Sequence, residues 1–244
     1  MLKPFIFLDL FESDHISGKG FAPHPHSGIA TVSVFLEGAM TYADSTGKAG
    51  ALSPGSVEWM RAGAGVWHSG EMPEGSAARG YQLWLALPPT LELASPESQY
   101  LEADAIASAG PARVILGNYQ GVASPIELPF AVTYLHVRLG DGERWTFAPD
   151  AGQTVAFVAC NAGRLHVSGL IIGREVAAFE AGNAPIEIIA EGAAEFVIGA
   201  ATPHPYPLVT GYYSVHTSAA ALAEGERNIA RLERSDVVHA LRLR

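Results

Sequence analysis

The chain has 244 residues, 48% of them hydrophobic and only 16% charged, which is enough to bury a large core in one big domain or two small ones. Its formal net charge of −10 argues against direct nucleic-acid binding, because phosphate contacts rely on clustered lysine and arginine. The 26 glycines and 16 prolines, spread among short apolar runs, favour an all-β protein over a helical bundle.

The first hundred residues consist of β-prone runs separated by turns. The pattern predicts strands over residues 5–10, 31–38, 40–42, 57–60 and 79–87. Pro88 ends the last of these strands, because proline cannot donate to a strand ladder. Residues 90–112 are less β-like and contain two prolines, so we place the connection between two halves there.

The second half repeats this rhythm of short strands. Strands are predicted over residues 112–116, 131–139, 154–159, 164–167, 175–179, 186–189 and 195–198. A weak internal repeat is the simplest account. The pair Thr217-Ser218 then forms an N-cap signal, and helical spacing of apolar residues predicts a helix over 218–233. We therefore expect domains at 1–110 and 111–215, with a C-terminal segment at 216–244 that packs back on them.

The single cysteine and the N-terminal sequence indicate in which cellular compartment the protein is expected. Because Cys160 stands alone, no intramolecular disulfide can form, and a cytoplasmic location is expected. It lies in an apolar run, so we expect a small core residue. The apolar run at 4–8 is cut short by Asp9 and lacks a cleavage-site pattern, which argues against a signal peptide. No stretch approaches the ~18 uncharged apolar residues of a membrane span, so no membrane association is expected.

The candidate site lies in His24-Pro25-His26, read together with His68. In a strand His24 and His26 point to the same face, and a short antiparallel meander can fold back to bring His68 beside them. Three imidazoles and one carboxylate suit a first-row transition metal and leave positions open for substrate or oxygen. Fe(II) is the favoured ion, with Mn, Ni, Cu and Zn as alternatives. The expected counterpart in the second half, residues 149–155, carries no histidine, so a single site is predicted.

Several motifs over residues 4–88 together resemble the pirins of the cupin superfamily. They are His24-Pro25-His26-x-Gly28, Leu36-Glu37-Gly38, Asp44-Ser45-Thr46-Gly47, Pro54-Gly55-x-Val57-x-Trp59-Met60-x-Ala62-Gly63-x-Gly65-x-x-His68-Ser69 and Gln82-Leu83-Trp84. The resemblance implies a bicupin: two stacked antiparallel β-barrels, one metal in the N-terminal barrel, a degenerate second barrel and a C-terminal helix. Pirins are associated with quercetin 2,3-dioxygenase activity and, in animals, with co-regulation of transcription factors.

The resemblance implies the metal ligands His24, His26 and His68, with a glutamate two residues after the last histidine. In this chain that position is Gly70, and the carboxylate arrives one residue later at Glu71. In a regular strand Glu71 would face away from His68, whereas a β-bulge at Gly70 would return it to the metal side. Both arrangements remain open. A second departure is Ser27, where pirins usually carry arginine, and this change is expected to alter the mouth of the pocket.

The favoured function is a metal-dependent dioxygenase of the quercetinase type, acting with O₂ on a flavonol or similar planar aromatic. Glu71 would serve as general base, and Gln82, Trp67 and Met60 would line the substrate pocket. One alternative is a metal-binding regulatory module that docks on a protein partner without turnover. Another is a cupin isomerase or other non-oxidative enzyme that uses the metal as a Lewis acid. One fold hosts many chemistries, so the motifs alone do not rank these.

Overall fold

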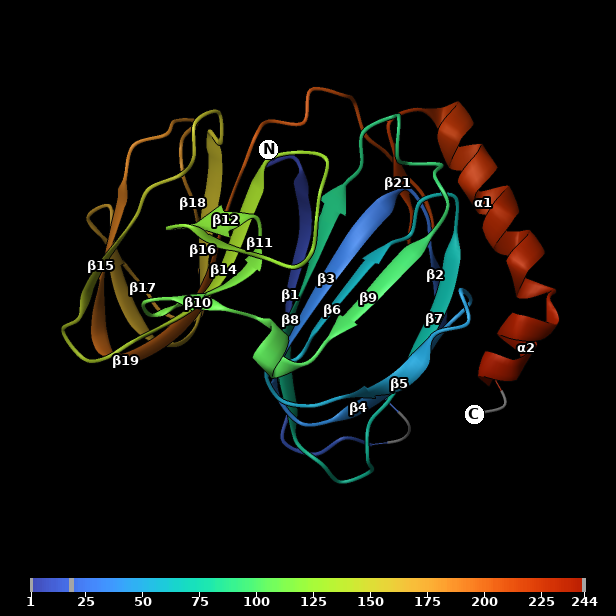
Figure 1. The fold of residues 1–244 in the computed structure, drawn as a ribbon, viewed down its shortest axis with the longest axis horizontal. Coiled ribbons are helices and arrows are strands. Elements are labelled where there is room, and N and C mark those ends of the chain that lie inside the picture. The colour runs from blue at the N-terminus through green and yellow to red at the C-terminus, as the bar shows by residue number, and fades with distance from the viewer. Residues whose placement is uncertain (1, 18–19, 243–244) are drawn as a thin grey trace. The chain divides into compact units, whose positions relative to one another are not determined.

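The computed structural model describes residues 2–17 and 20–242, and its secondary structure is mostly β with two helices at the end (Figure 1). The predicted all-β class with a C-terminal helix is therefore confirmed. The chain forms two compact units. Of the described residues, the first unit comprises 5–17, 20–103 and 204–242, and the second comprises 2–4 and 104–203.

The first unit is built from two antiparallel sheets. One sheet has the order β1 (Phe5–Ser13), β8 (Ala78–Ala86), β3 (Ile29–Glu37), β6 (Val57–Arg61) and β9 (Glu97–Leu101). The other has the order β2 (Gly20–His26), β7 (Val66–Glu71), β4 (Met40–Asp44) and β5 (Ala49–Leu52). The strands predicted in this half match β1, β3, β4, β6 and β8 to within three residues at their ends.

The core of the first unit lies between these two sheets. The central strand β3 pairs with β8 on one side and β6 on the other, and all its residues except Glu37 are buried. Phe35 from β3 packs with Met40 and Leu52 from the opposite sheet. Burial of each such side chain contributes about 1.5–3 kcal/mol, which favours a middle strand whose buried residues are apolar except for Thr31 and Ser33.

The C-terminal part of the first unit begins with a small hairpin of β20 (Val209–Thr210) and β21 (Val215–His216). Helix α1 (Ala219–Glu233) follows, and the side chain of Ser218 accepts a hydrogen bond from the Ala221 amide, as an N-cap should. The predicted helix over 218–233 is confirmed. A second helix, α2 (Asp236–Arg242), was not predicted, because seven residues give too short an apolar pattern.

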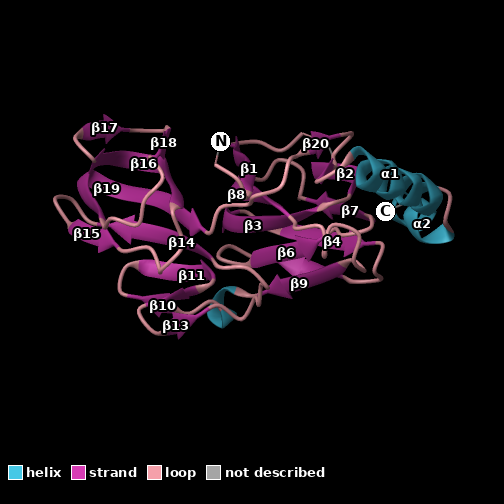
Figure 2. Ribbon diagram, turned by 90° about the horizontal axis from the view of Figure 1, so that it is seen from above, coloured by secondary structure: helices cyan, strands magenta, loops and turns pink. Residues whose placement is uncertain are grey.

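The two helices cover β2 and β7 of the first unit (Figure 2). Trp67 of β7 packs with Ile229 of α1 and with Val238 and Leu241 of α2. Its indole Nε1 donates a hydrogen bond to the Ile229 carbonyl over 3.1 Å. This packing on β2 and β7 ties the last 25 residues of the described chain to the strands that carry the histidines.

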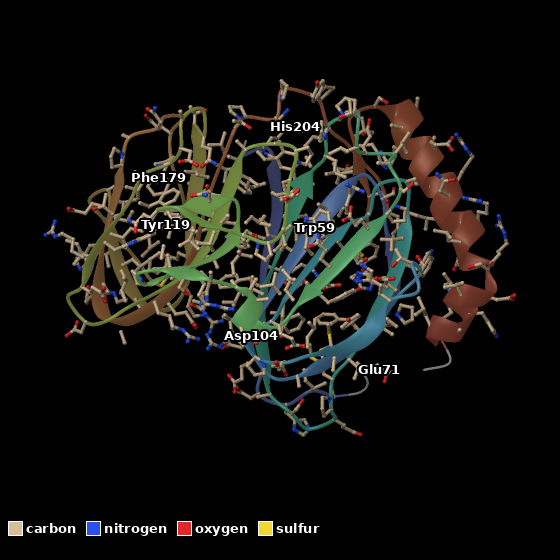
Figure 3. The ribbon with its side chains drawn as sticks, in the orientation of Figure 1. Trp59, Glu71, Asp104, Tyr119, Phe179 and His204 are labelled. Atoms are coloured by element: carbon tan, nitrogen blue, oxygen red, sulfur yellow. The ribbon has the colours of Figure 1, made fainter. Side chains whose placement is uncertain are left out.

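The second unit contains one large sheet and a small hairpin. The sheet has the order β10 (Ser108–Ala109), β11 (Ala112–Leu116), β14 (Val132–Leu139), β19 (Ile186–Ala201), β16 (Val155–Val167) and β17 (Leu170–Ile172). In addition β15 (Arg144–Phe147) pairs with β19, and β18 (Val176–Ala178) pairs with β16. The hairpin joins β12 (Asn118–Tyr119) and β13 (Val122–Ala123), and a 3₁₀ turn, η1 (Ala103–Ala105), lies where the chain enters the unit. Tyr119 and Phe179 lie among these strands in Figure 3.

Two pairs of short strands predicted in the second unit are each one long strand. Residues 154–159 and 164–167 belong to β16, and residues 186–189 and 195–198 belong to β19. The glycines that suggested turns, Gly163 and Gly192, have φ of 73° and 75° and lie inside the β16–β19 pairing, where the register shifts. Glycine here permits an irregular, bulged strand rather than ending it.

Cys160 is buried in the core of the second unit, as predicted. Burial raises the pKa of its thiol to about 11, so the side chain is a neutral packing residue at ordinary pH. Among residues 2–17 and 20–242, no helix is long and apolar enough to cross a membrane.

Candidate metal centre

Three histidines meet on two adjacent strands of the first unit. His24 and His26 lie two residues apart on β2, and His68 lies on β7 directly opposite His24. One ring nitrogen from each lies within 4.8 Å of the other two. Among the His, Cys, Asp and Glu side chains that the structure describes, this group is the one arranged to hold a metal ion. The structure thus brings together the three histidines predicted from their spacing.

An acceptor faces Nδ1 of each imidazole. The Nδ1 of His24 lies 2.8 Å from the backbone carbonyl two residues earlier, and that of His26 lies 3.1 Å from the Tyr213 carbonyl. The Nδ1 of His68 lies 3.4 Å from Oε1 of Glu58. These acceptors favour the tautomer that carries its proton on Nδ1, which leaves a lone pair on each Nε2.

The Nε2 atoms face one another. Those of His24 and His68 are 2.9 Å apart, and that of His26 is buried without a hydrogen-bond partner among the described residues. Lone pairs at this distance repel, and a cation placed between them removes the repulsion. Cis ligands at bonds of ~2.1 Å lie about 3 Å apart, which matches the observed separation. The donor set therefore fits a divalent transition metal.

The surroundings keep these imidazoles neutral, the form that binds a metal. Burial and then the nearby His68 lower the pKa of His24 to about 4. Burial, followed by His68 and His24, also lowers the pKa of His26 well below its usual value. Protons therefore compete weakly for these two rings at neutral pH.

These pKa shifts predict how the stability of the metal-free protein depends on pH. The pKa of a histidine in the unfolded chain is about 6.5, whereas the pKa of His24 in the folded protein is about 4. Between these two pH values the unfolded chain binds a proton at this position and the folded protein does not, so a falling pH favours unfolding. We expect the unfolding midpoint in urea to be constant above about pH 6.5 and to fall as the pH drops toward 4. In His24→Gln the decline over this window should be shallower, and an unchanged slope would contradict the shift.

Glu58 is a site residue that the motif analysis missed. It lies on β6 with only 3% of its surface exposed, next to the Nδ1 of His68. A carboxylate behind a metal-binding histidine fixes the ring orientation and makes the other nitrogen a stronger donor. The available signal was a charged residue inside the apolar strand sequence Val57-Glu58-Trp59-Met60.

We expect Glu58→Gln to weaken metal affinity about 10- to 100-fold, because the amide supports the His68 ring less than the carboxylate does. Competition against a chelator of known affinity measures the change. Glu97→Gln is a matched control, since Glu97 lies on the neighbouring strand β9 in an exposed ion pair with Arg61. Equal affinities of Glu58→Gln and the wild type would remove Glu58 from the site.

Glu71 does not join the histidines. Strand β7 pairs with β4 residue for residue from His68 to Glu71, so the ladder has no bulge at Gly70. The irregularity lies instead on β2, between Phe21 and His24. Glu71 therefore keeps the face opposite His68 and lines a separate hollow of about 250 Å³.

A close contact, and not a bulge, explains why position 70 is a glycine. A Cβ at this position would lie 2.2 Å from the Met40 sulfur, so the Met40 side chain occupies the space that a larger residue would need. Met40 belongs to an apolar cluster with Phe35 and Leu52. At the position where the resemblance places the fourth ligand, the unit thus holds an apolar contact.

We expect Glu71→Gln to bind metal with an affinity within about twofold of the wild type, because its side chain is on the far face of β7. Elemental analysis of the two proteins purified side by side gives the result. A clear loss of metal from the variant would restore Glu71 as a ligand.

The three residues predicted to line a substrate pocket have different positions. Trp67 faces the C-terminal helices and not the histidines, because it alternates with His68 along β7. Met60 is fully buried in an apolar cluster with Val66. Gln82 is half-buried and accepts a hydrogen bond from the Trp84 indole over 3.0 Å. Gln82 and the apolar cluster that holds Met60 both contact Trp84, whose ring lies beside His26, whereas Trp67 faces the helices.

Two aromatic residues that the motif analysis did not place in the site border it. The Trp84 ring lies 4.9 Å from the His26 ring, and the Tyr213 ring lies 5.5 Å from His24 and 5.7 Å from His26. Ser27 does not lie at the mouth of the site, contrary to expectation, since it is fully buried and contacts His216. Tyr213 is 187 residues from His26 in the sequence, so no local pattern indicates its position.

The N-terminal part of the chain is similar to known pirins. The sequence model of the Pirin family matches residues 1–85. A pirin-like protein of Caulobacter vibrioides is 46% identical over 110 residues, which span 43% of this chain and 40% of that protein. The alignment therefore covers less than half of that relative's length.

Solved structures with the same fold cover most of the chain. A quercetin 2,3-dioxygenase from Acinetobacter baumannii is 25% identical with a TM-score of 0.88, over 97% of this chain and 88% of that one. A bacterial pirin from Escherichia coli in complex with nickel(II) is 19% identical with a TM-score of 0.67, over 83% and 84% of the two chains, and shows the fold alone. The resemblance predicted from the motifs is confirmed: the chain carries a Pirin domain over residues 1–85 and has the fold of the pirin-like cupins.

Proposed function

We propose that the chain is a metal-dependent dioxygenase of the quercetin 2,3-dioxygenase type, acting with O₂ on a flavonol or a similar planar aromatic. The observation that supports it most is the set of three converging Nε2 atoms, each on a ring whose Nδ1 faces an acceptor. The similarity to a solved quercetin 2,3-dioxygenase supports the choice of reaction. Both the reaction and the class of substrate are proposed here.

His24, His26 and His68 would hold one divalent transition metal, and we favour Fe(II) because imidazole ligands with open positions suit it. When bound, such a metal polarises a coordinated hydroxyl of the substrate and exchanges electrons with O₂. Glu58 holds the His68 ring in the orientation that presents Nε2. We do not propose Glu71 as the general base, because its side chain lies on the face of β7 opposite His68.

The test is oxygen uptake by protein purified without added metal and then reconstituted with Fe(II) under anaerobic conditions. We expect about one equivalent of bound iron and quercetin-dependent uptake that rises in proportion to it. Bound metal without uptake, for quercetin and for simpler catechols, would favour the regulatory module. Turnover that persists without oxygen would favour a non-oxidative enzyme. Protein that binds none of Fe, Mn, Ni, Cu or Zn would overturn the proposal.

A further inference from the structure

A tight hairpin turn carries Tyr213 to the candidate metal centre. The turn connects β20 to β21, and its Gly211 amide donates to the Ser214 carbonyl over 2.8 Å. Tyr213 has φ of 52°, in the left-handed region that a bulky side chain rarely adopts. Such a conformation persists only where the surrounding structure enforces it.

A buried chain of polar contacts enforces it. Ser27 Oγ lies 2.9 Å from both Ser214 Oγ and His216 Nε2, and His216 Nδ1 lies 3.2 Å from Glu92 Oε2. Glu92 also accepts hydrogen bonds of 2.6 Å from the amide and the hydroxyl of Thr217. All five side chains are buried, so they hold the segment and are not open to a ligand.

Two glycines let this segment fit closely. A Cβ at Gly28 would lie 2.1 Å from the Val215 carbonyl oxygen, and Gly28 has φ of 76°. A Cβ at Gly225, in the middle of α1, would lie 2.4 Å from Ser27 Oγ and 2.5 Å from His216 Nε2. Glycine inside a helix lowers its stability, so its presence at this contact indicates a packing requirement.

The segment presents two parts of Tyr213 to the site. Its carbonyl oxygen accepts from Nδ1 of His26, and its ring lies beside the rings of His24 and His26. The side chain is nevertheless 41% exposed, so one part of the ring contacts the histidines while another faces outward. Trp84 and the 42%-exposed Phe7, whose rings are 4.7 Å apart, continue this aromatic surface.

We propose that Tyr213 is a specificity-determining residue of this site, whose ring packs against the planar aromatic substrate while its backbone carbonyl orients His26. The inference rests on the proposed function for its substrate class. Aromatic rings attract one another in offset or edge-to-face arrangements, so an exposed ring next to the ligands selects flat aromatic molecules. The two roles belong to different parts of the residue. The backbone carbonyl that contacts His26 should therefore stay in place when only the Tyr213 side chain is replaced.

The test compares Tyr213→Asn with Tyr213→Phe. Asparagine tolerates left-handed φ, so Tyr213→Asn removes the ring and keeps the backbone conformation. The control is Tyr212→Asn, because Tyr212 is an exposed neighbour whose ring contacts Tyr213 and none of the three histidines. Each protein is loaded with Ni(II), its metal content is measured, and 4-nitrocatechol is titrated against it by visible absorbance.

We expect all four proteins, wild type included, to bind equal amounts of metal. The Kd of 4-nitrocatechol should rise at least tenfold in Tyr213→Asn and stay within about threefold of the wild type in Tyr213→Phe and Tyr212→Asn. With Fe(II) and quercetin, KM should rise more than kcat falls in Tyr213→Asn. An unchanged Kd in metal-loaded Tyr213→Asn overturns the inference, whatever the turnover. Loss of nitrocatechol binding in that variant, with no oxygen uptake by the wild type, keeps Tyr213 as an aromatic-binding residue and rejects the dioxygenase instead.

Discussion

His68→Ala is expected to reduce metal affinity at least about a hundredfold and to abolish quercetin-dependent oxygen uptake. Two histidines cannot replace the third, because the remaining Nε2 atoms both come from β2 and the β7 side of the site is left without a donor. Elemental analysis of proteins purified without added metal should give about one equivalent of metal in the wild type and only background in His68→Ala. Uptake measured on the same samples should fall with it.

The fold of this variant needs its own check. His68→Ala leaves the buried carboxylate of Glu58 without the ring it faces, so thermal stability is expected to drop as well. His24→Ala avoids this problem, because His24 is half-buried and its Nδ1 faces a carbonyl of its own strand. It should lose metal while keeping the melting curve of the metal-free wild type, because bound metal itself raises the unfolding midpoint. His166→Ala, an exposed histidine of the second unit, is the control that should keep both. Full oxygen uptake by metal-free His24→Ala would refute the metal site.

Glu92→Ala is expected to cause the largest loss of stability, about 3 kcal/mol or more. It removes the acceptor for the amide and hydroxyl of Thr217 and the carboxylate next to His216, so two buried donors lose their acceptor and a buried imidazole loses its neighbour at once. A loss of this size lowers the midpoint of thermal unfolding by roughly 6–12 °C in a chain of this length. Circular dichroism during heating measures it.

Glu92→Ala should also weaken metal binding. Because Glu92 helps to hold the segment that places the Tyr213 carbonyl on His26, metal affinity of Glu92→Ala should fall even at temperatures where the variant is folded. Glu102→Ala is the matched control: Glu102 is exposed and accepts hydrogen bonds from the hydroxyls of Ser53 and Ser56, so its loss should cost less than about 1 kcal/mol. A Glu92→Ala protein as stable as this control would show that the buried network does not anchor the segment.

Features that depend on neighbours in the chain were predictable from the sequence. The pairing of His24 with His26 follows from the two-residue repeat of a strand, and the start of α1 follows from the N-cap at Ser218. The mostly apolar, β-branched sequence of β3 fits a strand buried on both faces. The position of Glu71 was open because a single inserted residue can be absorbed by a bulge or leave the strand regular.

Tertiary structure alone decided the rest. The bulge formed on β2 rather than at Gly70, since Met40 from β4 fills the space beside that glycine. Glu58 reaches His68 from a different sheet, and Tyr213 reaches His26 across 187 residues. The sequence by itself therefore determined which residues could bind a metal, because side-chain periodicity is a local property of a strand. The orientation of those residues was decided by acceptors from distant segments, because only packing of the complete unit brings such groups within hydrogen-bond distance.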